Sequence, residues 1–293
     1  MRIPGFDDRA ACPAGVGIGY SIGGAGPPLL LLHGFPQTRA MWARIAPVLA
    51  QTHTVICPDL RGYGASDKPA QVADYSFREM ARDQLALMAE LGHARFAVAG
   101  HDRGGRVAHR PALDTPGAVE RLCVMDIVPT HTVLDPLRRE VAAAYWHWFF
   151  LAQPAPFPET LIGHDPDFFF EACLLGWGGA RLEDFDADQL DAYRAAWRDT
   201  ATIRGMCNDY RAALTHDFTD DAADPGQRVA CPTTVLYGAR GAMAREFDVP
   251  ATWAAKCTDI RAAAIAGGHF FPDTAPEATA EAIAAFLDAA RPA

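Results

Sequence analysis

The sequence predicts an α/β fold in which a mostly parallel sheet carries helices on both faces and a helical cap is inserted. Three observations support this prediction. Short, fully apolar runs alternate with helical patterns in the first half of the chain, as parallel strands and their crossover helices do. A long block without strand alternation interrupts this order. The alternation then returns near the C-terminus.

The predicted strands and helices follow one another in regular order. An alternating segment at 17–22 precedes four apolar runs that we interpret as buried parallel strands, at 28–32, 54–57, 96–99 and 122–125. Two more strands are predicted at 233–237 and 262–266. Helical patterns occupy 38–50, 76–91, 104–113 and 275–290. Pro111 falls inside the third of these helices, where a proline removes a backbone hydrogen bond, so we expect a bend there.

Residues 130–213 break this order, because they are helical in pattern, rich in aromatic side chains and without strand alternation. The aromatic segments 145–150 and 168–170 stand out. We expect this block to form a cap over the strand ends, with residues 1–129 and 214–293 as the core of the fold. The acidic, turn-rich segment 220–226 is predicted to be a solvated loop.

Composition excludes several functional classes. The chain has 293 residues, of which 50% are hydrophobic and 21% charged, as in a globular protein with a large core. It has no apolar run of about 18 residues and starts without the apolar stretch of a secretory signal, so we expect no membrane association. Seven widely spaced cysteines, without a C-x-x-C pair, are typical of reduced, buried thiols in a cytoplasmic protein.

The charge balance also limits the partners. The formal net charge is −10 and no basic stretch is present, which argues against nucleic acid as a partner. A small anionic substrate would therefore need a local concentration of arginine. We expect neither a metal nor a cofactor.

Residues 99–105, Ala-Gly-His-Asp-Arg-Gly-Gly, carry the most specific signal. A buried strand ends there, a tight turn flanked by glycines follows, and a helix begins. This is the pattern of the nucleophile turn of α/β-hydrolases, with Asp102 at the position where a serine often stands. Gly100 and Gly104 fit such a turn because it is strained and crowded. The alternative interpretation is that Asp102 only caps the helix.

An aspartate at this position changes the chemistry of the turn. A serine that attacks a saturated carbon would form an ether, which water does not easily cleave. A carboxylate that attacks the same carbon forms an ester, and activated water can hydrolyse that ester and regenerate the enzyme. Asp102 therefore predicts halide displacement or epoxide opening, and argues against peptide or ester hydrolysis.

The base that activates this water is predicted to be His269, on a glycine turn directly after the last predicted strand. The commonest orienting acid of this fold follows the strand before the last, but the sequence there is Gly-Ala-Arg-Gly, without an acid. Asp126, directly after the strand at 122–125, is available instead, and a subset of α/β-hydrolases uses that position. Asp248 is a weaker alternative.

The segment His33-Gly34-Phe35-Pro36 resembles the oxyanion loop of this fold. We expect the backbone N–H groups of Phe35 and Arg103 to stabilise the oxyanion that forms when water attacks the ester. His33 itself is predicted to be a structural loop residue rather than an acid or base.

Two arginines beside the nucleophile indicate the substrate class. Arg103 and Arg106 stand three apart at the start of a helix, so they can share one face. Arginine binds a carboxylate through two parallel hydrogen bonds, and a helix N-terminus adds positive potential. The pair is a candidate site for a substrate carboxylate held against Asp102. Arg110 and His109 are interpreted as surface ion-pair residues.

Three segments together resemble the fluoroacetate dehalogenases, which are α/β-hydrolases with a helical cap. They are Gly-His-Asp-Arg-Gly-Gly-Arg-Val-Ala-His-Arg at 100–110, Asp-Ile-Val-Pro-Thr at 126–130 and Tyr-Trp-His-Trp at 145–148. The resemblance covers nearly the whole chain, and the segments agree in type, order and spacing. Ordinary haloalkane dehalogenases carry a tryptophan directly after the nucleophile, where this chain has Arg103.

The resemblance implies hydrolysis of a haloacetate, fluoroacetate or chloroacetate, to glycolate, by a homodimer. Its catalytic residues would be Asp102, His269 and Asp126, its carboxylate site Arg103 and Arg106, and its halide site His147, Trp148 and Tyr210. Each halide-site residue carries a hydrogen-bond donor on an otherwise apolar body, as the departure of fluoride requires. On spacing alone, the tryptophan and histidine of this site would be assigned to an aromatic cap core.

Two alternatives remain open. An epoxide hydrolase shares the nucleophile, base and fold, and would need two cap tyrosines to protonate the epoxide oxygen. Tyr145, Tyr193 and Tyr210 are available for this, but the arginine pair would then have no purpose. A non-catalytic ligand receptor on the same scaffold is the second alternative, and the intact catalytic residues argue against it.

Overall fold

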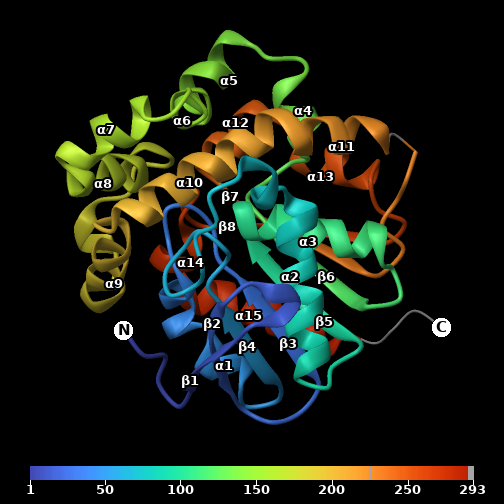
Figure 1. Cartoon of the computed structure of the whole chain (residues 1–293). Coiled ribbons are helices and arrows are strands. Elements are labelled where there is room, and N and C mark those ends of the chain that lie inside the picture. The colour runs from blue at the N-terminus through green and yellow to red at the C-terminus, as the bar shows by residue number, and fades with distance from the viewer. Residues whose placement is uncertain (225, 290–293) are drawn as a thin grey trace.

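The computed structural model describes residues 1–224 and 226–289, and eight strands in these residues form one sheet (Figure 1). The strands are β1 Asp7–Ala11, β2 Ile18–Gly23, β3 Pro28–Leu32, β4 Thr54–Pro58, β5 Phe96–His101, β6 Val119–Met125, β7 Thr233–Gly238 and β8 Ile260–Ile265. They lie in the order β1-β2-β4-β3-β5-β6-β7-β8. Every neighbouring pair from β4 to β8 is parallel, so the predicted fold class is confirmed.

The sequence predicts no strand at β1, which pairs antiparallel with β2. The side chains of β1 are mostly exposed because it forms the edge of the sheet. It therefore lacks the apolar run that marks the buried strands. β2 is itself antiparallel to β4, so an antiparallel edge joins a parallel interior.

Helices cover the sheet. Those outside residues 130–213 are α1 Ala46–Leu49, α2 Phe77–Glu90, α3 Arg103–Asp114, α11 Phe218–Ala223, α12 Ala242–Glu246, α13 Val249–Ala254, α14 Phe271–Thr274 and α15 Pro276–Asp288, with short turns η1 Pro13–Gly15, η2 Arg39–Arg44 and η3 Val72–Tyr75. α2 packs against α3, and α1 against α15. α3 contains Pro111 and continues beyond it.

The prediction of one helix at 38–50 is wrong. The 3₁₀ helix η2 comes first, and the four-residue helix α1 follows it. Pro47 contributes to this break, because it has no backbone N–H to continue a helical hydrogen-bond pattern from the preceding turn.

Residues 130–213, the predicted cap, are largely helical. Their helices are α4 Thr130–Leu134, α5 Arg139–Ala144, α6 Trp146–Leu151, α7 Phe157–His164, α8 Pro166–Gly176, α9 Ala187–Trp197 and α10 Thr200–Ala212, with the 3₁₀ turn η4 Leu182–Asp184. Figure 1 shows these helices gathered at one end of the sheet, with α10 lying across that end. This is the end at which β5 runs into Asp102.

The prediction of a solvated loop at 220–226 is wrong for its first half. A π-helix at Ala213–Asp217 and then α11 continue α10 without a break. Figure 1 shows this helical stretch crossing from the cap to the core. Residue 225 lies outside the described residues.

Arginines of the core neutralise the acidic end of this stretch. Asp220 contacts Arg78 at 2.5 Å, and Asp221 lies 3.6 Å from Arg110. Asp224 contacts both arginines, at 3.1 and 2.9 Å. Arg110 is buried, so its interpretation as a surface ion-pair residue is correct for the ion pairs and wrong for the surface. These distant partners explain why an acidic segment folds against the core.

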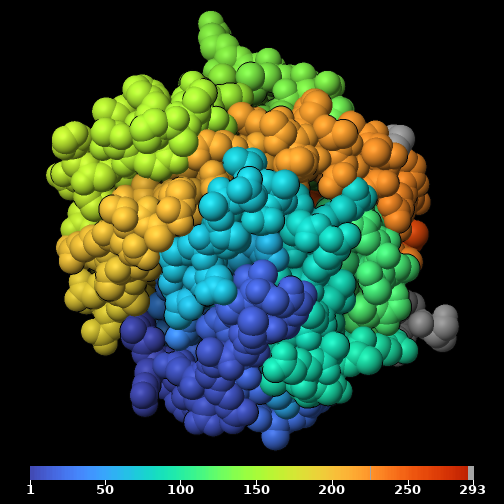
Figure 2. Space-filling model, viewed as in Figure 1, coloured from blue at the N-terminus to red at the C-terminus, as the bar shows by residue number. Residues whose placement is uncertain are grey.

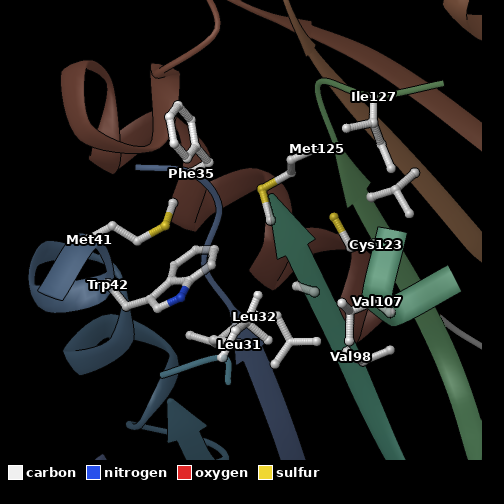
Figure 3. Packing of buried hydrophobic residues seen from close by; sticks show 14 of the residues in the cluster. Leu31, Leu32, Phe35, Met41, Trp42, Val98, Val107, Cys123, Met125 and Ile127 are labelled. Carbon is white, nitrogen blue, oxygen red and sulfur yellow. The ribbon is translucent and has the colours of Figure 1, made fainter. Parts of the chain in front are cut away.

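The interior of the sheet is apolar and closely packed. Figure 3 shows Val107 of α3 beside Val98 of β5, and Trp42 of η2 beside Leu32 of β3. All of these side chains are buried. Packing on the central strands therefore fixes the ends of β3 and β5, from which the oxyanion loop and the nucleophile turn start.

Among the residues that the structure describes, no helix has the length and hydropathy needed to span a bilayer. Within the same ranges, no group of three or more His, Cys, Asp or Glu side chains is arranged to hold a metal ion. The seven cysteines are free thiols, but Cys12 is exposed and Cys231 only partly buried, so the expectation of burial is wrong for these two.

Candidate active site

The nucleophile turn joins β5 directly to α3 through Asp102. Its φ of 50° and ψ of −117° are strained for a residue with a Cβ atom. Space is equally restricted, because a Cβ on Gly100 would lie 2.3 Å from the Gly104 carbonyl oxygen. A Cβ on Gly104 would lie 2.4 Å from the carbonyl oxygen of His33. Glycine at both positions therefore allows the turn that presents Asp102.

Asp102 precedes the first residue of α3 but does not cap the helix. Its side chain accepts no hydrogen bond from the backbone N–H groups of the first helical turn, all of whose residues the structure describes. Its Oδ1 instead accepts the N–H of Phe35 at 3.0 Å, and its Oδ2 lies 3.7 Å from Nε2 of His269. Burial opposes ionisation, but His269 and the other cationic groups nearby lower the pKa of Asp102 to about 2. The side chain is therefore an ionised carboxylate beside the predicted base.

His269 follows β8 and contacts Asp126, with 2.7 Å between Nδ1 and Oδ2. Because an ionised carboxylate only accepts hydrogen bonds, Nδ1 carries a proton and Nε2 faces Asp102. Burial lowers the pKa of His269, but the hydrogen bond and charge of Asp126 outweigh burial and raise this pKa above its usual value. The structure thus brings the three predicted catalytic side chains together.

Asp126 follows β6 with a φ of 51°, and its Oδ1 accepts the N–H of Gly238 at 2.8 Å. Gly238 ends β7, the strand after which the commonest orienting acid would stand. The alternative acid, Asp248, caps α13 instead by accepting the N–H of Ala251 at 2.9 Å. Of the two candidates, Asp126 is the one in contact with His269.

The oxyanion loop is held by His33. Its Nε2 accepts the N–H of Leu60 at 3.0 Å, and its Nδ1 donates to the Gly34 carbonyl oxygen at 3.0 Å. Both ring nitrogens are therefore used inside the loop, as expected of a structural residue. The loop presents the N–H of Phe35 to the carboxylate of Asp102.

Arg103 lies beside the nucleophile, but most of its guanidinium is already bound. Its Nε donates to Oδ2 of Asp209 at 2.9 Å, and its Nη2 donates to the Asp209 backbone oxygen at 3.0 Å and to Oδ1. Among the described residues, Nη1 has no partner. Arg103 was expected to bind a substrate carboxylate through two parallel hydrogen bonds, but it makes these two hydrogen bonds to the carboxylate of Asp209 instead.

Arg106 is also buried, but no carboxylate contacts it within the described structure. Its Nη1 donates to the Val128 carbonyl oxygen at 2.8 Å and to the Thr130 hydroxyl at 3.0 Å. Its Nε has no partner among the described residues. Burial and repulsion from Arg103 lower the pKa of Arg106. This arginine is the less neutralised of the two.

The three halide-site candidates form one cluster with the arginines. The guanidinium carbons of Arg103 and Arg106 lie 5.3 and 4.9 Å from the Trp148 ring. Tyr210 lies 5.5 Å from the rings of both His147 and Trp148. The Tyr210 hydroxyl and Nδ1 of His147 are buried and have no hydrogen-bond partner in the part of the chain that the structure describes.

The other two cap tyrosines differ in their surroundings. The Tyr193 hydroxyl donates to Asp273 at 2.7 Å, so it is committed to that contact. The Tyr145 hydroxyl has only a weak contact, 3.8 Å from the sulfur of Met243. Burial raises the pKa of Tyr145, and the charges of Asp126, Arg106 and Asp102 also act on it.

Sequence reasoning missed several residues of the site. Asp209 binds Arg103, and Trp177 packs on His147 with 4.1 Å between ring centroids. His101 donates from Nε2 to the His269 carbonyl oxygen at 2.9 Å. A buried charge is stabilised by an opposite charge, which was the one available signal for Asp209. The sequence did not indicate which acidic residue would reach it.

Comparisons with known proteins agree with the fold and the resemblance. A family model described as the alpha/beta hydrolase fold matches residues 27–276. A fluoroacetate dehalogenase of Burkholderia sp is 51% identical over 290 residues, which are 98% of this chain and 95% of the relative. A soluble epoxide hydrolase of Corynebacterium sp. (strain C12) is 31% identical over 261 residues, 88% of this chain and 89% of the relative.

Solved structures of similar chains have the same fold. A protein of Nostoc sp PCC 7120 described as an alpha/beta hydrolase has a TM-score of 0.95 and 44% identity, covering 97% of this chain and 99% of that one. A protein of Pseudomonas aeruginosa described as an epoxide hydrolase has a TM-score of 0.92 and 41% identity, covering 98% and 97%.

Proposed function

The chain belongs to the fluoroacetate dehalogenase family of α/β-hydrolases, and we propose that it hydrolyses a haloacetate, fluoroacetate or chloroacetate, to glycolate. The observation that carries this proposal is the ionised carboxylate of Asp102 beside the buried Arg103 and Arg106. A carboxylate nucleophile suits attack on saturated carbon. Two buried arginines suit a substrate that carries its own carboxylate.

In the first step, a carboxylate oxygen of Asp102 attacks the α-carbon of the haloacetate from the face opposite the halogen. A carbon–oxygen bond forms while the carbon–halogen bond breaks, and the halide leaves with the bonding electron pair. The product is a carboxymethyl ester of Asp102, that is, an ester between the Asp102 carboxyl group and the future hydroxyl oxygen of glycolate. This geometry inverts the configuration of any 2-halo acid that fits the site.

In the second step, Nε2 of His269 removes a proton from water, and the resulting hydroxide attacks the carbonyl carbon of the ester. The N–H groups of Phe35 and Arg103 stabilise the oxyanion, for which the present contact of Phe35 with Asp102 is support. As this intermediate collapses, His269 returns its proton to the departing alkoxide oxygen and glycolate is released. Asp102 is left as a carboxylic acid, which loses its proton and becomes a carboxylate again. Asp126 holds the imidazole in the tautomer that this transfer needs.

The departing halide requires donors, because fluoride is a poor leaving group that is stabilised by hydrogen bonds. His147, Trp148 and Tyr210 of the cap are proposed to provide them. The unpartnered Tyr210 hydroxyl and His147 Nδ1 within the described structure support this role, since buried polar atoms rarely stay without partners. We also propose that residues 130–213 act as one cap unit on a core of residues 1–129 and 214–293.

Halide release tests the proposal. Fluoroacetate and chloroacetate should release halide, whereas a neutral haloalkane of similar size should not. Arg103→Leu and Arg106→Leu should each lose roughly 2–5 kcal/mol of haloacetate catalysis, because the substrate carboxylate would stay unpaired in a buried site. Arg110→Gln is the control, since Arg110 is paired with acidic residues instead. Equal activity on the neutral compound, or fully active arginine variants, would contradict the carboxylate site.

Epoxide hydrolysis is the second candidate, favoured by the 31% identical epoxide hydrolase and by Tyr145. This tyrosine and Tyr210 would have to protonate the epoxide oxygen together. The buried arginine pair argues against it, because an epoxide carries no charge to bind there. An epoxide included as a substrate in the halide-release assay, with diol formation as the readout, separates the two activities. A protein inactive on all compounds would instead support the ligand-receptor alternative.

We further infer a homodimer located in the cytoplasm. Exposed apolar side chains on the cap support the homodimer: Trp146 of α6, Phe157 and Leu161 of α7, and Phe168 of α8 are 44–73% exposed. In Figure 2 the yellow-green atoms of this part of the chain form an outward shoulder of the molecule. Sedimentation of the wild type and of Phe168→Asp tests the inference, since a charge in the interface should yield monomers.

A further inference from the structure

Asp209 lies on α10 of the cap and reaches into the core. Its side chain is fully buried and binds Arg103 through both carboxylate oxygens, one of them at 2.9 Å from Nε. The same oxygen accepts the Tyr63 hydroxyl at 2.6 Å. A residue of the cap is therefore fixed simultaneously to the nucleophile helix α3 and to the turn after β4.

These contacts fix the direction of the guanidinium of Arg103. Because Nε and Nη2 are both bound to Asp209, Nη1 is the nitrogen left without a partner among the described residues. The guanidinium is planar, so two fixed nitrogens determine where the third points. Its central carbon also lies 4.4 Å from the Tyr210 ring and 4.5 Å from the Phe77 ring, and both contacts restrict its movement.

Asp209 also changes the charge that a substrate meets. Burial alone would lower the pKa of Arg103, but the nearby carboxylate of Asp209 raises it. The same carboxylate neutralises the positive charge of Arg103 by forming an ion pair with it. Arg106 is bound by a carbonyl and a hydroxyl oxygen, which carry no formal charge. The group of Arg103, Arg106 and Asp209 therefore carries a formal charge of one positive unit, although it contains two arginines.

We propose that Asp209 is a positioning and specificity residue, which directs Nη1 of Arg103 at the substrate and limits the site to substrates with one carboxylate. This inference rests on the proposed function, because it assigns the charge of the substrate at the same site. One helix would then serve both ends of the substrate, since Asp209 precedes Tyr210, the proposed halide donor, on α10.

The test compares wild type with Asp209→Asn in chloroacetate turnover and in competitive inhibition by acetate and oxalate. Oxalate is close to haloacetate in size but carries two carboxylates. In the wild type, acetate should inhibit more strongly than oxalate. In the variant, kcat should fall about tenfold or more because Arg103 is no longer held. Oxalate should gain about tenfold in affinity and acetate less, because the added positive charge acts on both carboxylates of oxalate.

Asp217→Asn is the matched control. Asp217 is a buried acid on the continuation of the same helical stretch, and it makes no hydrogen bond to Arg103 within the described residues. Its Oδ1 accepts the Phe77 N–H at 2.7 Å, which asparagine can also do. This control should keep the wild-type kcat and the wild-type preference for acetate.

A purely structural role for Asp209 would lower the thermal midpoint and the active fraction of the enzyme, but leave the oxalate-to-acetate ratio unchanged. An Asp209→Asn variant with the wild-type oxalate-to-acetate ratio and the wild-type kcat per active site would overturn the proposal. If Asp209→Asn does not fold, Tyr63→Phe removes one anchor of the same carboxylate and keeps its charge. It should lower kcat and leave the ratio unchanged, and an unaltered kcat would overturn the positioning role.

The two levels of inference remain distinguishable. A wild type without haloacetate activity, or a fully active Arg103→Leu variant, would contradict the proposed function itself. An active wild type and an impaired Arg103→Leu variant, together with Asp209→Asn that behaves as wild type, would contradict only the role of Asp209.

Discussion

The predicted catalytic side chains of the core and the predicted halide donors of the cap differ in how far their polar atoms are already bonded. In the core, Asp102 accepts the Phe35 N–H, Asp126 accepts the Gly238 N–H, and His269 is hydrogen-bonded to Asp126. In the cap, the Tyr210 hydroxyl and His147 Nδ1 are buried without a partner among the described residues. The difference supports the proposed roles: catalytic residues already in contact in the core, and halide donors in the predicted cap whose acceptor would be the departing halide.

The largest effect is expected from the core nucleophile. Asp102→Asn should reduce turnover by about 10⁴-fold or more, because an amide neither attacks carbon as a carboxylate does nor forms the ester. A single wild-type turnover in H₂¹⁸O, with enzyme in excess, should place the label in the Asp102 carboxylate. Label in glycolate alone would indicate direct attack by water and remove the covalent step.

His269→Ala should separate the two chemical steps. The variant should release halide once per active site and then stop, because the ester forms but no base activates water. Intact-mass spectrometry should show the carboxymethyl ester adduct on the stalled enzyme. Continued turnover in this variant would mean that another group acts as the base.

A pH profile sharpens the role of Asp126. Since Asp126 raises the pKa of His269, and only the neutral imidazole accepts a proton, ester hydrolysis should slow as the pH falls through that raised pKa. Asp126→Asn should move this acid limb to lower pH and slow hydrolysis by roughly 10²–10⁴-fold, through loss of the imidazole's orientation. Decay of the adduct in quenched single turnovers measures both effects. An acid limb at the wild-type pH would show that Asp126 does not set this pKa.

The smallest effect is expected in the cap. Tyr210→Phe removes one halide donor and should slow fluoride release by about 10–100-fold, with a smaller effect on chloride, which leaves more easily. Tyr193→Phe is the control, because its hydroxyl is bound to Asp273. The measurement is the ratio of fluoride to chloride release. An unchanged ratio in Tyr210→Phe would place the halide elsewhere and remove the proposed division between core and cap.

The sequence was most informative about candidate catalytic residues that directly follow predicted strands. Asp102 and Asp126 each follow a mostly buried strand, and His269 follows β8, an edge strand with mostly exposed side chains; parallel strands bring their carboxyl ends to one edge of the sheet. Their positions could therefore be inferred from apolar runs together with the glycine-rich turns that follow β5 and β8. The edge strand β1 could not, because exposure leaves it without that pattern.

Contacts made by the cap were less predictable. A helical period shows which face of a helix is buried, but not which residue of another element meets it. Asp209 was missed for this reason, although Arg103 itself was identified. The helix α11 was missed because its acidic side chains are neutralised by arginines far away in the sequence, such as Arg78. Without those partners, the local composition favours a loop.

The weakly neutralised Arg106 also has a consequence for the folding equilibrium. A buried cation without a carboxylate in contact lowers the stability of the ligand-free protein. A carboxylate bound at Arg106 would pair with this cation and stabilise the folded protein. Acetate, which cannot react, should therefore raise the thermal unfolding midpoint. The Arg106→Leu protein should be more stable than wild type without ligand, and acetate should raise its unfolding midpoint less, since only Arg103 would remain to bind the carboxylate. On this view, the protein maintains a less stable ligand-free state in exchange for affinity toward its substrate.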